Sequence, residues 1–242
     1  MAKTIYVMAA WGGRRRKPDP QGIQRKGDFF VREHVARISA CKNIDRIVVA
    51  SPLCDRPRKD YEEYILSLES AKEINGIPIE VLRRPNIGLS YGSYNDAYGK
   101  YRTAYDYYFV AEDDYLPALP GFDGILLEMI GKFPRCGFLC ALNWPNRNAP
   151  DHAGIFLGLI RAEALEKIWE KKGNLASFEG GGYGEAEHTG QIRMSWAIVE
   201  AGYEIRDWTA SYSSPYWHET GLKVYGNPKL PPLYVPGQTV KA

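Results

Sequence analysis

Three consecutive carboxylates, Glu112, Asp113 and Asp114, are the residues that point most directly to chemistry. They follow residues 107–111, whose aromatic, β-branched and small side chains predict a strand buried on both faces. Ligands of open α/β sheets bind at the carboxyl ends of strands, where these acids are expected. Adjacent carboxylates repel one another, and a divalent metal would offset that repulsion. The pattern predicts Mg²⁺ or Mn²⁺ bound with a nucleotide diphosphate, and the alternative is a solvated acidic turn.

The composition describes a globular protein with a sizeable core. The chain has 242 residues, 45% of them hydrophobic, and a formal net charge of +2. This length suits one large α/β domain or two small ones, and the charge excludes a polybasic binder and an acidic tail protein. The 17 tyrosines and 6 tryptophans suit either a groove that stacks on sugars or bases, or the core itself.

The sequence favours a cytoplasmic protein. No stretch is apolar for long enough to span a membrane, and the N-terminus lacks the order of regions found in a signal peptide. The cysteines show no CxxC spacing, and we expect them to be reduced core residues. They are Cys41, Cys54, Cys136 and Cys140.

Strands and helices are predicted to alternate. Apolar runs predict strands at residues 4–10, 46–52, 79–82, 107–111, 137–142, 152–161 and 206–210. Helical spacing of apolar residues predicts helices between them, two of which cover residues 122–133 and 162–169. The opening βαβ series predicts a parallel sheet with right-handed crossovers.

Helix boundaries are predicted from capping residues. Asp28 is a candidate N-cap of the first helix, and Asp60 with Glu63 forms a capping box at the second. The second helix is expected to end at Gly76. His34 lies on or beside the apolar face of the first helix, where we expect a packing histidine rather than a ligand.

The segment before the acids resembles a known family. Arg84, Asn86 and Gly88 form an Arg-x-Asn-x-Gly pattern, followed by a helix carrying Asn95 and by the strand that ends in the acids. This order is similar to the nucleotide-binding half of GT-A glycosyltransferases, notably the family-2 type. The resemblance implies a single GT-A (Rossmann-like) α/β domain, with a mostly parallel central sheet flanked by helices.

The resemblance also implies a donor site and a metal site. Glu112-Asp113-Asp114 looks like the DxD motif of that family, so Asp114 is implied to bind the metal and Glu112 or Asp113 to face ribose or sugar. His218 is implied as a second metal ligand, and the alternative is a stacking histidine. The other implied donor-binding residues are Ala10, Trp11, Gly12, Asp55, Arg84, Asn86, Gly88 and Asn95.

A second informative stretch carries two acids after three glycines. Gly180-Gly181-Gly182 predicts a flexible lid or hinge, and Glu185 and Glu187 follow at the start of a predicted helix. In inverting GT-A enzymes an acidic pair at this place acts as general base, which implies Glu187, or else Glu185, in that role. Acids in a first turn also complement the helix dipole. The spacing departs from the family pattern, so the inverting outcome stays open.

The acceptor is the least defined part of the site. Acceptor-binding residues are implied at Trp144, His152, Gly154 and Tyr183. Aromatic side chains suit a glycan acceptor, whereas basic residues could follow a nucleic-acid backbone or form a solvated face. These basic residues are Arg14, Arg15, Arg16, Lys17, Arg25, Lys26 and Arg32.

The prediction is one glycosyltransferase domain over residues 1–242. Residues 1–116 would form the nucleotide-binding half, residues 117–211 the acceptor half, and residues 212–242 a C-terminal loop or lid. The enzyme would use Mn²⁺ or Mg²⁺ and a nucleotide-diphosphate sugar donor. One alternative is a sugar-phosphate nucleotidyltransferase, for which the basic glycine loop from Gly12 to Lys17 is a loose match. Another is a non-catalytic nucleotide-sugar-binding protein on the same fold.

Overall fold

The computed structural model describes residues 2–12, 27–117, 121–144, 152–175 and 183–208, together with the short segments 216–217, 223–224 and 234–236. Its first half contains β1 (Thr4–Ala9), α1 (Phe29–Ile38), β2 (Arg46–Pro52), α2 (Lys59–Ala71), β3 (Glu73–Ile74), β4 (Ile77–Arg84), α3 (Leu89–Tyr101), β5 (Tyr107–Glu112) and β6 (Tyr115–Pro117). Its second half contains α4 (Phe122–Gly131), β7 (Cys136–Trp144), β8 (His152–Arg161), α5 (Ala162–Lys172), α6 (Tyr183–Glu200), β9 (Glu204–Asp207), β10 (Tyr216–Trp217), β11 (Lys223–Val224) and β12 (Tyr234–Pro236).

The central sheet has eight strands among the described residues, in the order β3-β4-β2-β1-β5-β8-β7-β9. The pairs β4-β2, β2-β1, β1-β5 and β7-β9 are parallel, and β3-β4, β5-β8 and β8-β7 are antiparallel. The predicted α/β fold with a mostly parallel sheet is confirmed. The antiparallel insertion of β8 beside β5 was not predicted, because the apolar pattern of a buried strand carries no direction.

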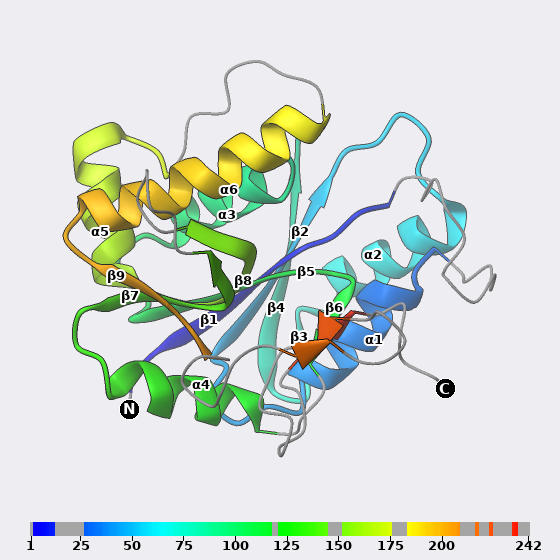
Figure 1. Ribbon diagram of the computed structural model, residues 1–242. Coiled ribbons are helices and arrows are strands. Elements are labelled where there is room, and N and C mark those ends of the chain that lie inside the picture. Colours follow the sequence, from blue (N-terminus) through cyan, green and yellow to red (C-terminus); the bar gives the residue numbers. More distant parts are fainter. Residues whose placement is uncertain are drawn as a thin grey trace.

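Helices cover both faces of this sheet and bury two apolar cores (Figure 1). The first core lies between the sheet and α1, α2 and α4, and the second lies between the sheet and α3, α5 and α6. Every residue of β1 is buried, as expected of a strand enclosed on both sides. The carboxyl ends of β1, β2, β4 and β5 therefore meet at one edge, which positions the loops that follow them.

Of the three predicted helix boundaries, one was right and two were wrong. Asp28 is the N-cap residue of α1, as predicted, and its carboxylate binds the guanidinium of Arg32 rather than a helix amide. α2 begins at Lys59, so Asp60 lies inside the first turn instead of at the cap. α2 also ends before Gly76, because Lys72 takes a left-handed conformation with φ of 59°.

Gly76 instead forms part of a β-hairpin. Asn75 and Gly76 connect β3 to β4, and both have positive φ, 52° and 78°. Asn-Gly favours a two-residue hairpin turn of this kind, because both residues tolerate the left-handed region. The dipeptide was therefore a local signal for the hairpin that the sequence analysis missed.

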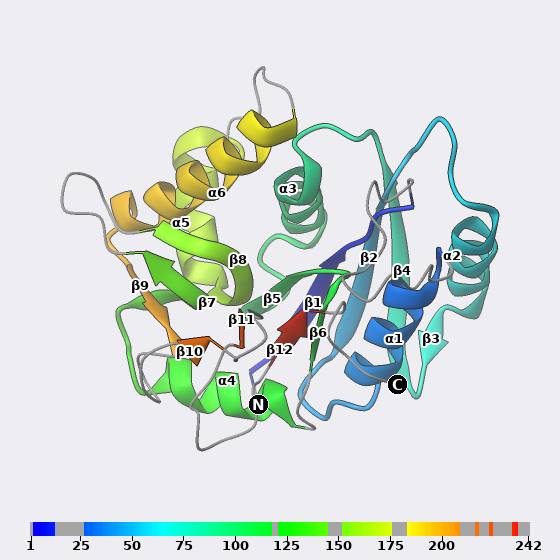
Figure 2. The same ribbon diagram turned by 45° about the vertical axis from the view of Figure 1, so that its right-hand side comes forward.

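The predicted loop-like tail contains short strands. β10 and β11 pair with each other, and β12 pairs with β6 in antiparallel register, Val235 opposite Leu116 (Figure 2). This pairing places residues 234–236 beside the strand that directly follows Asp114. No described helix is both long enough and apolar enough to cross a membrane.

The four cysteines are free thiols, as predicted. Cys136 and Cys140 are buried in the sheet, whereas Cys41 and Cys54 are only half-buried. The expectation that all four belong to the core was therefore right for Cys136 and Cys140. Cys41 is partly buried and packs against the first core, whereas Cys54 belongs to neither core.

Candidate functional site

The acidic turn, residues 112–114, lies at the carboxyl edge of the sheet. Glu112 is the last residue of β5 and pairs in parallel register with Ala9, the last residue of β1. The backbone amide of Asp113 then donates to the carbonyl oxygen of Ala9 over 3.0 Å. The acids thus begin where two parallel strands end side by side, which is the position predicted for a ligand site.

Asp113 binds the protein itself. Its side chain is only 4% exposed, and Oδ2 accepts a hydrogen bond of 3.2 Å from the amide of Trp11. This bond joins the acidic turn to the loop after β1. The three acids are therefore not equivalent, because Asp113 organises the turn while Glu112 and Asp114 are half-buried at the edge.

Glu112 is oriented by the first turn of α3. The hydroxyl of Ser90 donates to Oε1 of Glu112 over 2.7 Å. A carboxylate near a helix N-terminus is also favoured by the helix dipole. Ser90 was absent from the predicted site, since a serine in the first turn of a helix has many other structural uses.

His34 supports the acidic turn from the core side. Its ring is fully buried on α1, with Nδ1 3.1 Å from the carbonyl oxygen of Asp113 and Nε2 2.7 Å from the hydroxyl of Tyr6. A carbonyl oxygen can only accept, so Nδ1 carries the proton and Nε2 accepts from Tyr6. The predicted packing histidine is thus also a hydrogen-bonding partner of the turn.

The imidazole of His34 is neutral at ordinary pH. Burial lowers its pKa from 6.5 to about 4, and the nearby charge of Arg37 adds to that fall. The hydrogen bond with the carbonyl of Asp113 opposes it. The ring therefore keeps one donating and one accepting nitrogen, as the contacts with Asp113 and Tyr6 require.

The free energy of unfolding should fall on acidification because of His34. Its imidazole takes a proton near pH 6.5 in the unfolded chain but only near pH 4 in the folded protein, so the unfolded state binds more protons between these values. Going from pH 7 to pH 5 should cost about 2 kcal/mol at this residue. Urea unfolding at both pH values should show a steeper loss in the wild type than in His34→Asn. Equal pH dependence of the two proteins would contradict the assignment.

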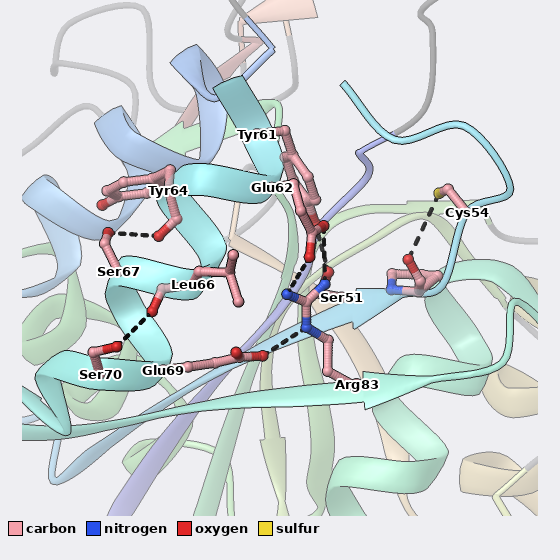
Figure 3. Close-up of polar contacts among 11 residues, drawn as sticks. Ser51, Cys54, Tyr61, Glu62, Tyr64, Leu66, Ser67, Glu69, Ser70 and Arg83 are labelled. Atoms are coloured by element: carbon pink, nitrogen blue, oxygen red, sulfur yellow. Dashed lines mark hydrogen bonds and ion pairs between the residues drawn. The ribbon is translucent and has the colours of Figure 1, made fainter. Parts of the chain in front are cut away.

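The end of β1 packs tightly against α2. The ring of Tyr61 lies against Gly12, where a Cβ atom would come within 2.3 Å of Cε1 of that ring. The hydroxyls of Tyr61 and Ser51 lie 2.9 Å apart, which ties α2 to β2 (Figure 3). Burial raises the pKa of Tyr61 well above its usual value, so its hydroxyl is neutral. Gly12 is therefore needed for close packing at this edge.

Arg83 holds α2 against β4. Its guanidinium contacts Oε1 of Glu62 and Oε1 of Glu69, each over 2.6 Å (Figure 3). The hydrogen bonds that Arg83 donates to the two carboxylates, first to that of Glu62, raise the pKa of Arg83. This arrangement fixes the helix whose first turn borders the site.

The start of α2 also binds the backbone of Gly12 and of Gly27. Residues 13–26, between these two glycines in the sequence, lie outside the described residues. The amide of Arg58 donates to the carbonyl of Gly12 over 3.0 Å, and the amide of Gly27 donates to the carboxylate of Asp60. The backbone of Gly12 and that of Gly27 are thus both attached to the start of α2.

Arg84 binds the loop that follows it. It is 4% exposed, forms a 2.7 Å ion pair with Asp96, and donates to the carbonyl oxygens of Ile87 and Leu89. A Cβ atom on Gly92 would lie 2.0 Å from the Ile87 oxygen, so the loop lies directly on α3. The guanidinium that was predicted to meet the donor is engaged in holding this loop.

Replacing Arg84 by Met should lower the free energy of unfolding by about 2 kcal/mol, because Asp96 and two carbonyl groups lose their partner. Asp96 is partly exposed, and solvent screening reduces the cost. Urea unfolding would measure this change. Asp96→Asn is the matched control and should cost about 1 kcal/mol, since the two carbonyl bonds remain. Unchanged stability combined with a raised KM for nucleotide would instead favour the donor-binding role.

Asn95 also binds within the protein. Its side chain accepts from the amide of Leu175 over 2.9 Å and donates to Asp96 over 3.2 Å. Residue 175 follows α5, so Asn95 connects the two halves of the chain. This contact explains a polar residue on α3 without any ligand.

The other predicted donor-binding residues lie around the same edge. Ala10 is buried in the first core, whereas Trp11 is 37% exposed. Asp55 and Asn86 are exposed in the loops after β2 and β4, and Gly88, with φ of 73°, caps α3. The strand order thus brings these positions together, and their roles toward a ligand remain predictions.

The acceptor-side residues lie on three elements. Trp144 pairs with His152 at the ends of β7 and β8, and Gly154 is also in β8. The beginning of α6 contains Tyr183, Glu185 and Glu187, of which only the backbone is described. His218, the predicted second metal ligand, lies outside the described residues.

α6 is attached to α3 and β8. The hydroxyl of Tyr91 donates to the side-chain oxygen of Gln191 over 3.2 Å, and the side-chain amide nitrogen of Gln191 donates to the carbonyl of Ala153. Gly190 lies against the ring of Tyr91, where a Cβ atom would be 2.5 Å away. Since Tyr91 follows Ser90, the contact to Glu112 and the contact to α6 come from the same turn of α3.

The donor set at the acidic turn fits a metal that is shared with a ligand. Among the described residues, no three His, Cys, Asp or Glu side chains are grouped to hold a metal ion by themselves. Mg²⁺ in nucleotide sites uses one or two carboxylates and takes its other ligands from phosphates and water. Asp114 and Glu112 provide carboxylates of that kind, while Asp113 is occupied by Trp11.

Comparison with known proteins identifies the architecture. No family model matches this chain, and no curated protein matches it. A cytidylyltransferase from Leptospira borgpetersenii serovar Hardjo-bovis (strain JB197) is similar in structure, with a TM-score of 0.51 and 14% identity over 93% of this chain and 82% of that one. A 4-diphosphocytidyl-2C-methyl-D-erythritol synthase has a TM-score of 0.50 and 11% identity, over 95% and 94% of the two chains. This chain shares its α/β fold with these two proteins.

The comparisons correct the predicted function. The sequence motifs favoured glycosyl transfer from a nucleotide-diphosphate sugar, by a family-2 type enzyme. The similar structures are nucleotidyltransferases with a GT-A-like fold, which was the stated alternative. The resemblance thus located the architecture correctly and assigned the wrong reaction. The two reactions share a metal-binding acid motif at the end of a strand, and that motif does not distinguish them.

Proposed function

We propose that this protein is a nucleotidyltransferase that makes a nucleotide sugar from a nucleoside triphosphate and a sugar phosphate. The observation that carries the proposal is the bond between Asp113 and Trp11, which fixes the acidic turn beside the end of β1. It leaves Glu112 and Asp114 at the edge where parallel strands end. The nucleotidyltransferase fold supports the choice of reaction.

The reaction is a substitution at the α-phosphorus. An oxygen of the sugar phosphate forms a new bond to this phosphorus, and the bond from it to the oxygen bridging to the β-phosphate breaks. Pyrophosphate leaves with that oxygen. A phosphate monoester already carries negative charge near neutral pH, so the attacking group needs no general base. Glu185 and Glu187 therefore have no required role in this reaction.

The residues of the edge would bind and orient the triphosphate. Asp114, with Glu112 beside it, would hold Mg²⁺ or Mn²⁺, which when bound offsets the negative charge of the phosphates. Ser90 keeps Glu112 oriented, and Asp113 keeps the turn attached to β1. The basic residues 14–17 come shortly after Gly12 in the sequence. Because they are positively charged, we assign them the role of binding the negatively charged triphosphate.

The test is to identify the product that the protein releases. Purified protein is incubated with Mg²⁺, one nucleoside triphosphate and a panel of sugar phosphates, starting with CTP because of the two similar structures. We expect pyrophosphate in an enzyme-coupled assay and a nucleotide sugar by mass spectrometry. No pyrophosphate from any triphosphate, together with release of a nucleoside diphosphate from a nucleotide sugar, would overturn the proposal. Binding of nucleotides without any turnover would identify a binding protein instead.

A further inference from the structure

Helix α1 holds the acidic turn and the strand after it at two points. Nδ1 of His34 donates to the carbonyl oxygen of Asp113 over 3.1 Å, and one turn later Arg37 donates to the carbonyl oxygen of Pro117 over 2.8 Å. Both bonds connect α1 with backbone that is distant in the sequence. The segment from Asp113 to Pro117 is therefore fixed from the core side at both ends.

The bond from His34 acts on the peptide group that determines where Asp114 points. The carbonyl of Asp113 belongs to the peptide unit between Asp113 and Asp114, and this unit is planar. Fixing the direction of its oxygen therefore fixes the plane from which the backbone of Asp114 continues. The amide of Asp113 donates to Ala9, its carboxylate accepts from Trp11, and its carbonyl accepts from His34.

The surroundings of His34 require a specific reason for a polar ring. His34 is fully buried, and its ring centroid lies 5.5 Å from that of Tyr6 in an edge-on arrangement. A polar group in an apolar core destabilises the fold unless its hydrogen bonds are made. Here both nitrogens are satisfied, one by Tyr6 and one by the acidic turn. An apolar side chain would fill the same core and could not hold the turn.

We propose that His34 is a positioning residue, which orients the Asp113–Asp114 peptide and thereby the carboxylate that would bind the metal and nucleotide. The expected effect on metal binding rests on the proposed function. The orientation of the Asp113–Asp114 peptide rests on the hydrogen bonds alone. His34 itself touches neither substrate nor metal. Partners that orient metal ligands typically contribute 10- to 100-fold to metal affinity.

Two substitutions separate the donor role from packing. His34→Asn places an amide nitrogen on Cγ, where Nδ1 is, and keeps a donor for the Asp113 carbonyl. In His34→Gln the amide nitrogen lies three bonds from Cβ, as Nε2 does in histidine. The glutamine amide therefore faces Tyr6 and leaves no donor at the position of Nδ1. Both variants remove the ring and lose similar packing contacts. Each variant is therefore the control for the other.

Two measurements apply to both variants and to the wild type. Hydrogen–deuterium exchange, followed by mass spectrometry, reports on the backbone amides of residues 112–115 in the protein alone. Electron paramagnetic resonance measures the affinity for Mn²⁺ in the presence of CTP. We expect His34→Gln to exchange these amides at least about tenfold faster and to bind Mn²⁺ about 10- to 100-fold more weakly, with His34→Asn close to the wild type.

The two proposals fail in different ways. Equal behaviour of the Asn and Gln variants in amide exchange would show that His34 only packs, and would overturn the positioning role. Faster exchange in His34→Gln with unchanged Mn²⁺ affinity would overturn it too, because the turn would then not orient the ligand. A wild-type protein that binds no Mn²⁺ with any nucleoside triphosphate would contradict the proposed function. Amide exchange would still decide whether His34 holds the turn.

Discussion

Replacing Asp114 by Asn should slow pyrophosphate release about 100- to 1,000-fold and leave the fold intact. The substitution keeps the size of the side chain and removes its negative charge. Asp114 is half-buried and adjoins Asp113, whose bonds to β1 are unaffected by the change. The expected loss therefore reflects metal and phosphate binding, and the rate should be measured over a range of Mg²⁺ concentrations.

The matched control for Asp114 is an acid remote from the acidic turn. Glu128 is exposed on α4, where it pairs with Lys132 over 2.7 Å, and Glu128→Gln removes the same charge. It should leave turnover and thermal stability unchanged, since exposed ion pairs contribute little. Turnover of Asp114→Asn within threefold of the wild type would remove this residue from the site. A large loss of stability in Asp114→Asn would leave Glu112→Gln as the variant that tests the metal site.

The position of the acids was predictable from the sequence because it depends on two features of neighbouring residues, a buried strand and the polar turn that follows it. A strand enclosed on both faces needs an unbroken apolar run, and residues 107–111 have one. A polar turn must follow where the strand leaves the core, and residues 112–114 provide it. The same reasoning located β1, β2 and β4 correctly.

The contacts that organise the site could not be predicted in this way. Asp113 meets Trp11 across 102 residues of sequence, His34 meets Asp113 across 79, and Ser90 meets Glu112 across 22. Apolar periodicity describes one element at a time and does not say which helix face meets which turn. The acid motif also did not separate glycosyl transfer from nucleotidyl transfer, because both predictions place carboxylates at this edge of the sheet.

One methyl group added at Gly158 should strongly destabilise the fold. It lies in β8 between Val110 of β5 and Cys140 of β7, and its φ is 152°. A Cβ atom there would lie 2.0 Å from the carbonyl oxygen of Leu139 and 2.9 Å from Cα of Cys140. These are backbone atoms of a paired strand, so they cannot rotate away as the end of a side chain could. The antiparallel insertion of β8 beside the acidic strand therefore depends on glycine at this position.

Gly158→Ala should lower the free energy of unfolding by about 4 kcal/mol, from steric overlap and backbone strain together. Urea unfolding followed by circular dichroism would measure it. Gly131→Ala is the matched control, because this residue ends α4 and no described atom beyond its chain neighbours and its own helix backbone lies within 4 Å of the added carbon. The control should be neutral or gain up to about 1 kcal/mol, since alanine favours helix more than glycine does. Similar stabilities of the two variants would mean that β5, β8 and β7 can separate at Gly158 without loss. The strand that carries Glu112 would then not need β8 as a rigid neighbour.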